Sequence, residues 1–464
     1  MNWVNEVFKR KEELVKDTQM LLQIESVLNK ATAAQKNPFG AGIARCLQFL
    51  LQKAESDGFT VKNLDGYAAH IEWGEGEEIV GVLCHIDVVP PGDNWTSDPF
   101  SAEIRDGKIF ARGAIDDKGP TMAAYYALKI VKGLNLSLKK RVRLIIGTDE
   151  ESDWNCVKHY FKHEEMPVLG FAPDADFPII NSEKGLIDFY LKKDNDGDTY
   201  KKGSTVLHSF SSGLRLNMVP GIAEARLQTK NKEQIKREFN GFLENGKLSG
   251  KIEEKEDLLH IQLKGKSAHA AEPDNGVNAG LVLADFLVRF DLDENSKAFF
   301  EQILSLFFND TRGRKLGIDC KDSISGELTL NVGILEYNLE QGGKAGVNIR
   351  YPVSETSDRI KKAFEDLDQF RLENFHYSKP HHVAEDHQLI TVLKKVYEEQ
   401  TGKTADLISI GGATYARSLE SGVAFGPLFP GKPDTAHQSD EYIEIDDLLK
   451  AASLYAQAIY ELAR

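Results

Sequence analysis

The chain has 464 residues, 41% of them hydrophobic, which is too long for a single core and predicts two or three domains, or one domain that carries a large insertion. Lys and Arg total 57 against 72 Asp and Glu, a net charge of −15, and no Lys/Arg-rich block with interleaved aromatic residues occurs, which argues against nucleic acid and membranes as partners. Four scattered cysteines without a C-x-x-C pair, and no apolar run of signal-peptide or membrane-spanning length, lead us to expect a cytoplasmic protein.

The N-terminal part predicts helices followed by strands. Residues 1 to about 30 place apolar side chains three and four positions apart, which predicts a surface helix. A second helix is expected from about Gly40 to Gly58. Strands are predicted at residues 60–63, 68–73 and 78–85. The last is almost entirely apolar, so it should be buried on both faces of a sheet.

An acidic loop follows. Residues 112–119 read Arg-Gly-Ala-Ile-Asp-Asp-Lys-Gly, and the apolar run after Pro120 predicts a helix. An apolar strand at 141–148 leads into Asp149-Glu150-Glu151, and a short strand at 168–171 leads into Pro173-Asp174. Because buried strands alternate with helices, we expect an α/β layered domain with a mostly parallel sheet.

From about residue 186 the pattern changes to alternating strands. Strands are predicted at 187–191, 214–218, 223–228, 259–263, 327–335 and 344–351, with helices at 232–244, 279–290 and 357–368. The α/β pattern then returns with a helix at 388–400, a strand at 423–425 and a terminal helix at 443–462. We therefore predict a first domain formed by residues 1–185 and 383–464, interrupted by an inserted α+β domain over residues 186–382.

One acidic segment in the insertion resembles a calcium loop. It reads Asp194-Asn195-Asp196-Gly197-Asp198, but its glycine comes two positions early and Thr205 stands where the twelfth-position Glu is required. We expect an acidic hairpin turn here.

Carboxylates and imidazoles collect at strand exits and in loops. The residues concerned are His85, Asp87, Asp116, Glu150, Glu151, Asp174 and His437. In α/β sheets, ligands bind outside the carboxyl ends of the strands, and oxygen and imidazole nitrogen atoms are ligands for divalent metals. Each fragment alone is more common as a turn or a solvated loop. Their joint occurrence favours a metal site.

Amide hydrolysis needs a nucleophile made from water, a base, and a group that stabilises charge on the tetrahedral oxygen. Two divalent ions bridged by a carboxylate can provide the first and the third. We assign Asp116 as the bridge, His85 and Asp174 to one ion, and Glu151 and His437 to the other.

Glu150 precedes a ligand and is the predicted general base. Asp87 is predicted to accept the second N–H of the His85 imidazole and so fix its tautomer. Other chemistries fit less well, because residues 265–267 lack the upstream glycine of a P-loop and Ser409 lacks the first glycine of a nucleophile elbow.

With these residues assembled, the chain resembles the M20 family of dinuclear metallopeptidases, and within it the PepV-type bacterial dipeptidases. The matching motifs are Cys84-His85-Ile86-Asp87-Val88-Val89-Pro90, residues 112–119, Gly147-Thr148-Asp149-Glu150-Glu151-Ser152, Pro173-Asp174-Ala175-Asp176-Phe177-Pro178 and Ala436-His437-Gln438-Ser439-Asp440-Glu441. The resemblance implies a zinc-peptidase-like α/β catalytic domain with an inserted α+β lid. It also implies two divalent ions, Zn with Mn or Co as alternatives, and a cis Asp116–Asp117 peptide.

The resemblance extends into the insertion. It implies that His269 helps a metal to polarise the scissile carbonyl, and that Asn217 and Arg350 hold the C-terminal carboxylate of the substrate. A guanidinium matches a carboxylate in bidentate geometry. The segment Gly411-Gly412-Ala413-Thr414 resembles a substrate-binding loop in which relatives often have Thr where Ala413 stands.

We therefore predict a metallodipeptidase that hydrolyses dipeptides with a free C-terminal carboxylate, through a water shared by two metal ions and the base Glu150. An N-acyl-amino-acid deacylase of the same family and a non-catalytic binding protein on this fold are the alternatives. We expect small-molecule dipeptides as partners and a monomer, with a dimer formed through the lid as the other possibility.

Overall fold

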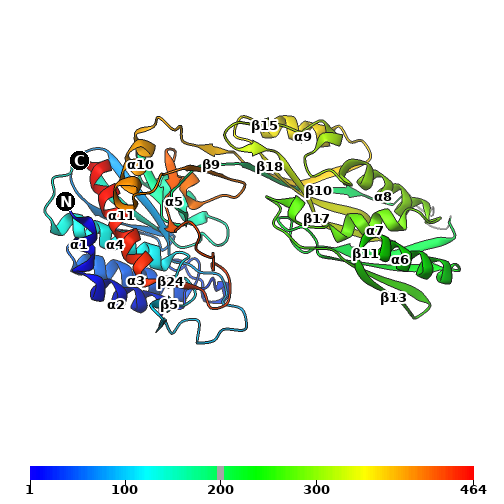
Figure 1. Ribbon diagram of the computed structural model, residues 1–464, viewed down its shortest axis with the longest axis horizontal. Coiled ribbons are helices and arrows are strands. Elements are labelled where there is room, and N and C mark those ends of the chain that lie inside the picture. Colours follow the sequence, from blue (N-terminus) through cyan, green and yellow to red (C-terminus); the bar gives the residue numbers. More distant parts are fainter. Residues whose placement is uncertain (196–202) are drawn as a thin grey trace. The chain divides into compact units, whose positions relative to one another are not determined.

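The computed structural model describes residues 1–195 and 203–464, which divide into two compact units (Figure 1). Unit 1 comprises Met1–Asn181, His382–Ile408 and Ala413–Arg464. Unit 2 comprises Ser182–His381 and Ser409–Gly412. The predicted acidic turn at 194–198 lies partly outside the described residues.

The N-terminal region of unit 1 has the predicted elements, with one difference. The single helix expected over residues 1–30 is two helices, α1 (Trp3–Phe8) and α2 (Lys11–Leu22). The next elements are α3 (Ala41–Ser56), β1 (Thr60–Leu64), β2 (Ala68–Trp73) and β3 (Ile79–His85). Every residue of β3 is buried, as its apolar sequence predicts.

The large sheet of unit 1 is mixed, with a parallel centre. Its strand order is β1-β2-β6-β3-β7-β22-β9-β20, and β21 (Leu407–Ile410) also pairs with β9. The strands β6 (Arg141–Gly147), β3, β7 (Leu169–Ala172) and β22 (Gly422–Ala424) are parallel. The antiparallel pairs are β1 with β2, β2 with β6, and β9 (Ile179–Glu183) with β22. The outer strand β20 is His381–His382.

Helices from both ends of the chain pack on this sheet. They are α4 (Lys118–Gly133), α5 (Asn155–His163), α10 (Gln388–Thr401) and α11 (Ile445–Ala463). One apolar core includes Leu14 and Val82 from the first segment together with Val423 and Ile459 from the last. The residues after unit 2 therefore complete the core of unit 1, since burying both sets of side chains requires both segments.

Two small sheets link loops of unit 1. β4 (Glu103–Arg105), β5 (Lys108–Phe110) and β24 (Tyr442–Glu444) form one, and β8 (Ala175–Asp176) pairs with β23 (Pro427–Leu428) in the other. The pairing of Phe110 with Tyr442 brings the chain after His437 beside the chain before Asp116.

Unit 2 is built on an eight-stranded antiparallel sheet of order β13-β14-β12-β11-β17-β18-β10-β19. Its strands are β10 (Gly185–Lys193), β11 (Thr205–Ser212), β12 (Ile222–Thr229), β13 (Ser249–Lys255), β14 (Leu258–Lys264), β17 (Thr329–Asn338), β18 (Gly342–Tyr351) and β19 (Arg371–Ser378). A short hairpin pairs β15 (Lys321–Asp322) with β16 (Gly326–Glu327).

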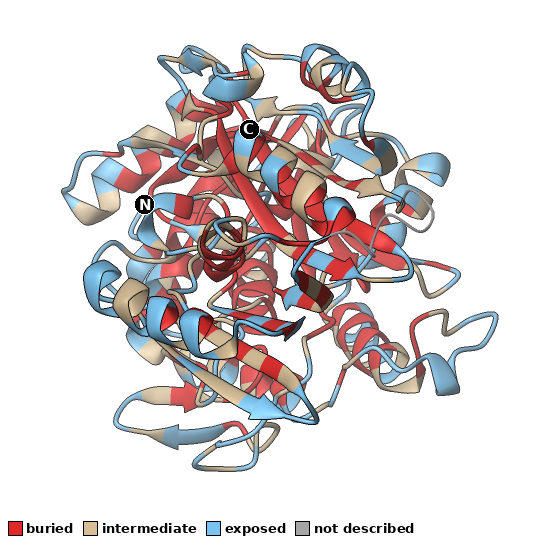
Figure 2. Ribbon diagram, turned by 90° about the vertical axis from the view of Figure 1, so that its right-hand side faces the viewer, coloured by how far each residue is buried: buried red, intermediate tan, exposed pale blue. Residues whose placement is uncertain are grey.

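Four helices cover one face of this sheet: α6 (Lys232–Gly246), α7 (Ala279–Leu287), α8 (Glu294–Phe307) and α9 (Ser357–Glu365). Burial alternates residue by residue along β12, as expected of a strand with one face on a core. In Figure 2, buried residues follow the sheet strands and the inward faces of the helices.

The strand predicted at residues 214–218 is wrong. The alternation of Leu214, Leu216 and Met218 imitates a strand, but the chain leaves the sheet after β11, where Gly213 adopts φ +80°, and Leu214 is 94% exposed. A Cβ at residue 213 would lie 1.9 Å from the Gly333 carbonyl oxygen, so this turn requires glycine.

Among the described helices, none combines the length and the apolar content needed to cross a membrane.

Candidate metal centre

The structure brings five of the predicted residues together in unit 1. They form two groups that share Asp116, and within each group the candidate ligand atoms lie within 4.8 Å of one another. The Nε2 atom of His85 is 3.0 Å from Asp116 Oδ1 and 3.6 Å from Asp174 Oδ2. The Nε2 atom of His437 is 3.0 Å from Asp116 Oδ2 and 3.0 Å from Glu151 Oε1. Each Asp116 oxygen thus faces a different histidine.

The parallel strands of the sheet explain how these side chains meet. His85 is the last residue of β3 and pairs with Gly147, the last residue of β6, so the loop that carries Glu150 and Glu151 starts level with His85. Asp174 follows β7, the other parallel neighbour of β3. Parallel strands end at the same edge of a sheet, and ligands bind there.

Asp87 connects the loop after β3 with the loop after β6. Its carboxylate accepts the backbone N–H groups of Glu150, at 3.1 Å, and Glu151, at 3.0 Å. The Nδ1 atom of His85 lies 3.0 Å from the Asp87 carbonyl oxygen and 3.5 Å from its carboxylate. The nearer acceptor for the imidazole is therefore the backbone of Asp87 and not the predicted side chain. Nδ1 donates to it, which leaves Nε2 with the lone pair that a metal needs.

Glu441 is a residue of this centre to which the sequence assigned no role. Its buried carboxylate accepts from the Arg112 guanidinium at 2.5 Å and from the backbone N–H groups of Gly113, Ile115 and Asp116 at 3.1, 2.9 and 3.2 Å. Glu441 thus fastens the loop after His437 to the loop that carries Asp116. Its only signal in the sequence was its place in the same motif as His437.

Asp116 and Asp117 have different surroundings. The peptide bond between them is cis. The fully buried Asp117 accepts the His85 N–H at 3.0 Å and the Thr121 hydroxyl at 3.2 Å. Asp117 therefore supports the end of β3, while Asp116 faces the histidines.

Burial and the crowding of acidic groups shift the pKa values of the centre. Burial raises the pKa of Glu150 well above its ordinary value, and burial together with Asp116 raises the pKa of Asp174 to about 6. Hydrogen bonds to Asp116 and Glu151 raise the pKa of His437 to about 10.

The Nε2 atom of His85 lacks a hydrogen-bond partner among the described residues. It is buried, and Asp116 lies 3.0 Å away without hydrogen-bond geometry. An unpartnered buried nitrogen facing several carboxylates is costly by itself, and a divalent cation would satisfy both kinds of group. The donor set therefore fits metal ions.

Most of the predicted substrate-binding residues lie in unit 2. Met218 and His269 form an isolated antiparallel bridge, and Ala270 N–H donates to Asn217 O at 2.9 Å, so Asn217 and His269 lie on adjacent segments. Burial and the nearby Arg350 lower the pKa of His269.

Arg350 and the glycine loop are connected by a hydrogen bond. Arg350 Nη1 donates to the Gly411 carbonyl oxygen at 2.7 Å, and Gly412 follows in the same segment of unit 2. Thr414 belongs to unit 1, where its hydroxyl accepts the Ala416 N–H at 3.3 Å.

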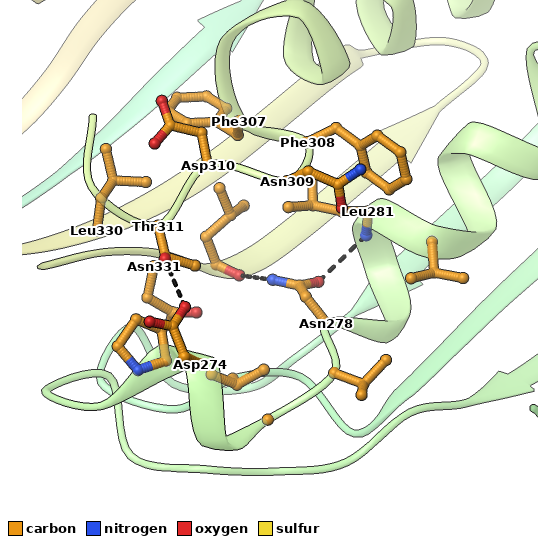
Figure 3. Close-up of a pocket in the computed structure, with 16 residues that line it drawn as sticks. Asp274, Asn278, Leu281, Phe307, Phe308, Asn309, Asp310, Thr311, Leu330 and Asn331 are labelled. Atoms are coloured by element: carbon orange, nitrogen blue, oxygen red, sulfur yellow. Dashed lines mark hydrogen bonds between the residues drawn. The ribbon is translucent and has the colours of Figure 1, made fainter. Parts of the chain in front are cut away.

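A separate cavity of about 420 Å³ lies within unit 2, among α7, the end of α8 and β17 (Figure 3). The polar groups on its wall have partners: Asn278 donates to Val332 O at 2.8 Å and accepts from Leu281 N–H at 3.1 Å, and Thr311 donates to Asp274 at 2.6 Å. None of the predicted site residues lines this cavity, but its wall includes Asn331, whose amide donates to Leu216 O and Met218 O on either side of Asn217.

Known proteins resemble this chain over its length. The family model "Peptidase family M20/M25/M40" matches residues 81–461. The Bacillus subtilis protein named "Putative dipeptidase YtjP" is 60% identical over 100% of both chains.

Solved structures share the fold. Human carnosine dipeptidase 1 matches with a TM-score of 0.56 at 15% identity, over 99% of each chain. The M20 family metallo-carboxypeptidase Sso-CP2 from Sulfolobus solfataricus matches with a TM-score of 0.57 at 17% identity, over 97% of this chain and 99% of that one. These matches confirm the predicted fold class, and the family match confirms the resemblance inferred from the motifs: the chain belongs to peptidase family M20/M25/M40 and is a metallopeptidase.

Proposed function

We propose that the protein is a dinuclear metallodipeptidase, with unit 1 as its catalytic domain and unit 2 as its lid. The observation that carries this proposal is the geometry of Asp116, whose two oxygens each lie 3.0 Å from a different histidine nitrogen. The relative named as a dipeptidase, which is 60% identical over the whole chain, supports the substrate class.

Five residues would hold the metal ions. His85 and Asp174 would bind one ion, Glu151 and His437 the other, and Asp116 both. Divalent ions supply Lewis acidity, which lowers the pKa of water and stabilises negative charge on a carbonyl oxygen. Zn suits these nitrogen and oxygen donors, and Mn or Co are the alternatives.

Glu150 transfers the proton. Its carboxylate accepts a proton from the attacking water and gives it to the leaving amine. Asp87 holds the backbone N–H groups of Glu150 and Glu151, which fixes the loop and so the direction of both side chains. The buried surroundings that raise the pKa of Glu150 make its carboxylate a stronger proton acceptor than an exposed glutamate.

Unit 2 recognises the substrate. The Arg350 guanidinium and Asn217 bind its C-terminal carboxylate, while His269 assists polarisation of the scissile carbonyl and Gly411, Gly412 and Thr414 contact the substrate backbone. Because the carboxylate bound in this way lies one residue after the scissile bond, longer peptides are disfavoured.

Substrate panels test this proposal. The purified protein with added Zn²⁺ or Mn²⁺ should cleave dipeptides with kcat/KM roughly a hundredfold above that for tetrapeptides, because a longer chain leaves Arg350 without its carboxylate. Equal rates on both lengths would contradict the recognition of the carboxylate. A preference for N-acetyl amino acids over dipeptides would assign the protein to the deacylases instead.

We further propose a cytoplasmic monomer. All four cysteines are free, as expected of a reducing compartment. Fractionation of the native cells and size-exclusion chromatography with light scattering test the location and the oligomeric state.

A further inference from the structure

We infer that a row of three side chains, Asp188, Asn348 and Asn331, positions the substrate ligands Arg350 and Asn217. This inference rests on the proposed function, and it assigns these three residues a positioning role without contact to the substrate. All five residues belong to unit 2.

The row crosses three neighbouring strands of the unit 2 sheet. Asp188 on β10 pairs with Asn348 on β18, and Asn348 pairs with Asn331 on β17. Residues that pair directly across strands have side chains on the same face. Along β10 the buried Ile187 and Phe189 flank the half-buried Asp188, so the row lies on the face opposite the apolar core.

Asp188 sets the orientation of the Asn348 amide. The Nδ2 atom of Asn348 donates to Asp188 Oδ1 at 2.6 Å, and its Oδ1 atom accepts from Arg350 Nε at 3.1 Å. A flipped amide would turn its NH₂ group toward the guanidinium, which has only donors, and its oxygen toward a carboxylate, which has only acceptors. The carboxylate of Asp188 therefore keeps Asn348 in the orientation that holds Arg350.

The guanidinium is held at two points. Asn348 accepts from its Nε atom, and the Gly411 carbonyl oxygen accepts from Nη1 at 2.7 Å. Asn348 and Arg350 are buried, with 1% and 5% of their surfaces exposed, so a lost hydrogen bond is not replaced freely by water. Because the Arg350 side chain is already restrained in the free protein, substrate binding costs less side-chain conformational entropy.

Asn331 restrains the turn that carries Asn217. Its Nδ2 atom donates to the carbonyl oxygens of Leu216, at 3.0 Å, and Met218, at 2.9 Å, the two residues that flank Asn217. The turn lies directly on Gly333, where a Cβ would come 2.3 Å from Leu216 O. The backbone next to Asn217 is therefore fastened to the sheet strand that also pairs with β18.

The test compares a dipeptide that the wild type cleaves with the same dipeptide carrying a C-terminal amide. Asp188→Ala and Asn348→Leu should lower kcat/KM for the free carboxylate about ten- to a hundredfold, mainly through KM, because a charge-assisted hydrogen bond is lost. Activity on the amide should change less than about threefold, since it lacks the group that Arg350 binds.

Two further variants make the comparison specific. Asp188→Asn retains an acceptor for Asn348 Nδ2 and should stay within about threefold of the wild type. Glu224→Ala is the matched control, because Glu224 accepts from Gln262 Nε2 at 2.7 Å across paired strands of the same sheet and should leave both rates unchanged. Melting temperature and metal content are measured on each variant.

The outcomes separate this inference from the proposed function. Equal losses on both substrates, or none, in Asp188→Ala and Asn348→Leu would overturn the inference alone. If Asn348→Leu does not fold, the contrast between Asp188→Ala and Asp188→Asn decides. A wild-type protein that cleaves no dipeptide would overturn the proposed function and this inference with it.

Discussion

At the residue scale, the candidate centre depends on carboxylates that receive different hydrogen bonds. Asp116 faces two imidazoles, whereas Asp87, Asp117 and Glu441 accept backbone N–H groups and carry the loops. A charged carboxylate that accepts several N–H groups is a strong local anchor. Residues beside the predicted ligands therefore decide the geometry that the ligands present.

Replacement of Glu150 tests the proposed base. Glu150→Ala should bind metal like the wild type but lower kcat by about 10²- to 10⁴-fold, because general base catalysis contributes that much. Metal analysis and steady-state kinetics on one preparation check both statements. Retained turnover would exclude Glu150 as the base, and lost metal would give it the role of a ligand.

Replacement of Glu441 tests the anchor of the Asp116 loop. Glu441→Ala leaves Arg112 buried without its partner and should lower the free energy of unfolding by about 3 to 5 kcal/mol. Because the Asp116 loop is released, metal affinity should also fall about 10- to 100-fold. Denaturant unfolding and metal titration measure these effects.

The control is Glu444→Ala, three positions further along, whose partly exposed ion pair with Lys432 should contribute no more than about 1 kcal/mol. Equal effects of the two replacements would contradict the specific role of Glu441.

At the element scale, many strands and helices follow from local patterns, whereas β11, β13, β19 and α8 of unit 2 were not predicted. The apolar run of β3 and the alternation of β12 predict their burial directly. Apolar and polar residues alternate in the same way over residues 214–218. There, however, Gly213 turns the chain with a positive φ, and the Asn331 amide donates hydrogen bonds to two carbonyl oxygens of the segment. A pattern of apolar residues does not specify which groups will form hydrogen bonds with the backbone of the segment.

A buried contact between β2 and α5 predicts a pH dependence of stability. His70 on β2 lies 2.9 Å from the Tyr160 hydroxyl, and burial and Arg143 lower the pKa of His70 to about 4. In the unfolded chain His70 binds a proton near pH 6.5, whereas in the folded chain it stays neutral down to about pH 4. The free energy of unfolding therefore decreases as the pH falls from about 6.5 to 4.

His70→Phe removes this contribution to the pH dependence. The loss of unfolding free energy between pH 7 and pH 4.5 should be smaller in the variant by roughly 2 to 3 kcal/mol. Denaturant unfolding at both pH values measures the difference. His163→Phe, on the exposed end of α5, is the control and should keep the wild-type dependence. An identical slope in all three proteins would contradict a neutral His70 in the folded state.

At the scale of the whole molecule, metal binding and folding of unit 1 should be linked. The ligand group Asp116, Glu151 and His437 combines residues from the first and the last segments of the chain, which share one core. The unfolded chain does not present them together, so a bound ion stabilises the folded state by mass action.

Removal of metal should therefore destabilise the protein. A chelator should lower the melting temperature of the wild type by several degrees, and added Zn²⁺ or Mn²⁺ should restore it, since an ion at a thousand times its Kd contributes about 4 kcal/mol. Asp116→Asn should reduce this shift strongly. Differential scanning fluorimetry measures it, and a wild-type melting temperature insensitive to both treatments would contradict the metal centre.

The sequence by itself determined the kinds of groups available and their order: a strand that ends in His85, strands followed closely by Glu150 and by Asp174, an acidic glycine-bounded loop, and an insertion with a different pattern. These features are local, because burial and backbone conformation repeat over a few residues. The family resemblance also followed from such local motifs.

Only the tertiary structure decided which atoms meet. It places His437 Nε2 3.0 Å from Asp116 Oδ2, although the residues of unit 2 separate the two in the sequence. It also directs the His85 imidazole to the backbone of Asp87 and joins Glu441 to the Asp116 loop. In unit 2 it brings Asp188, Asn348 and Asn331 into one row beside Arg350. These contacts depend on strand order and register, which result from packing the whole core and are not written in any single segment.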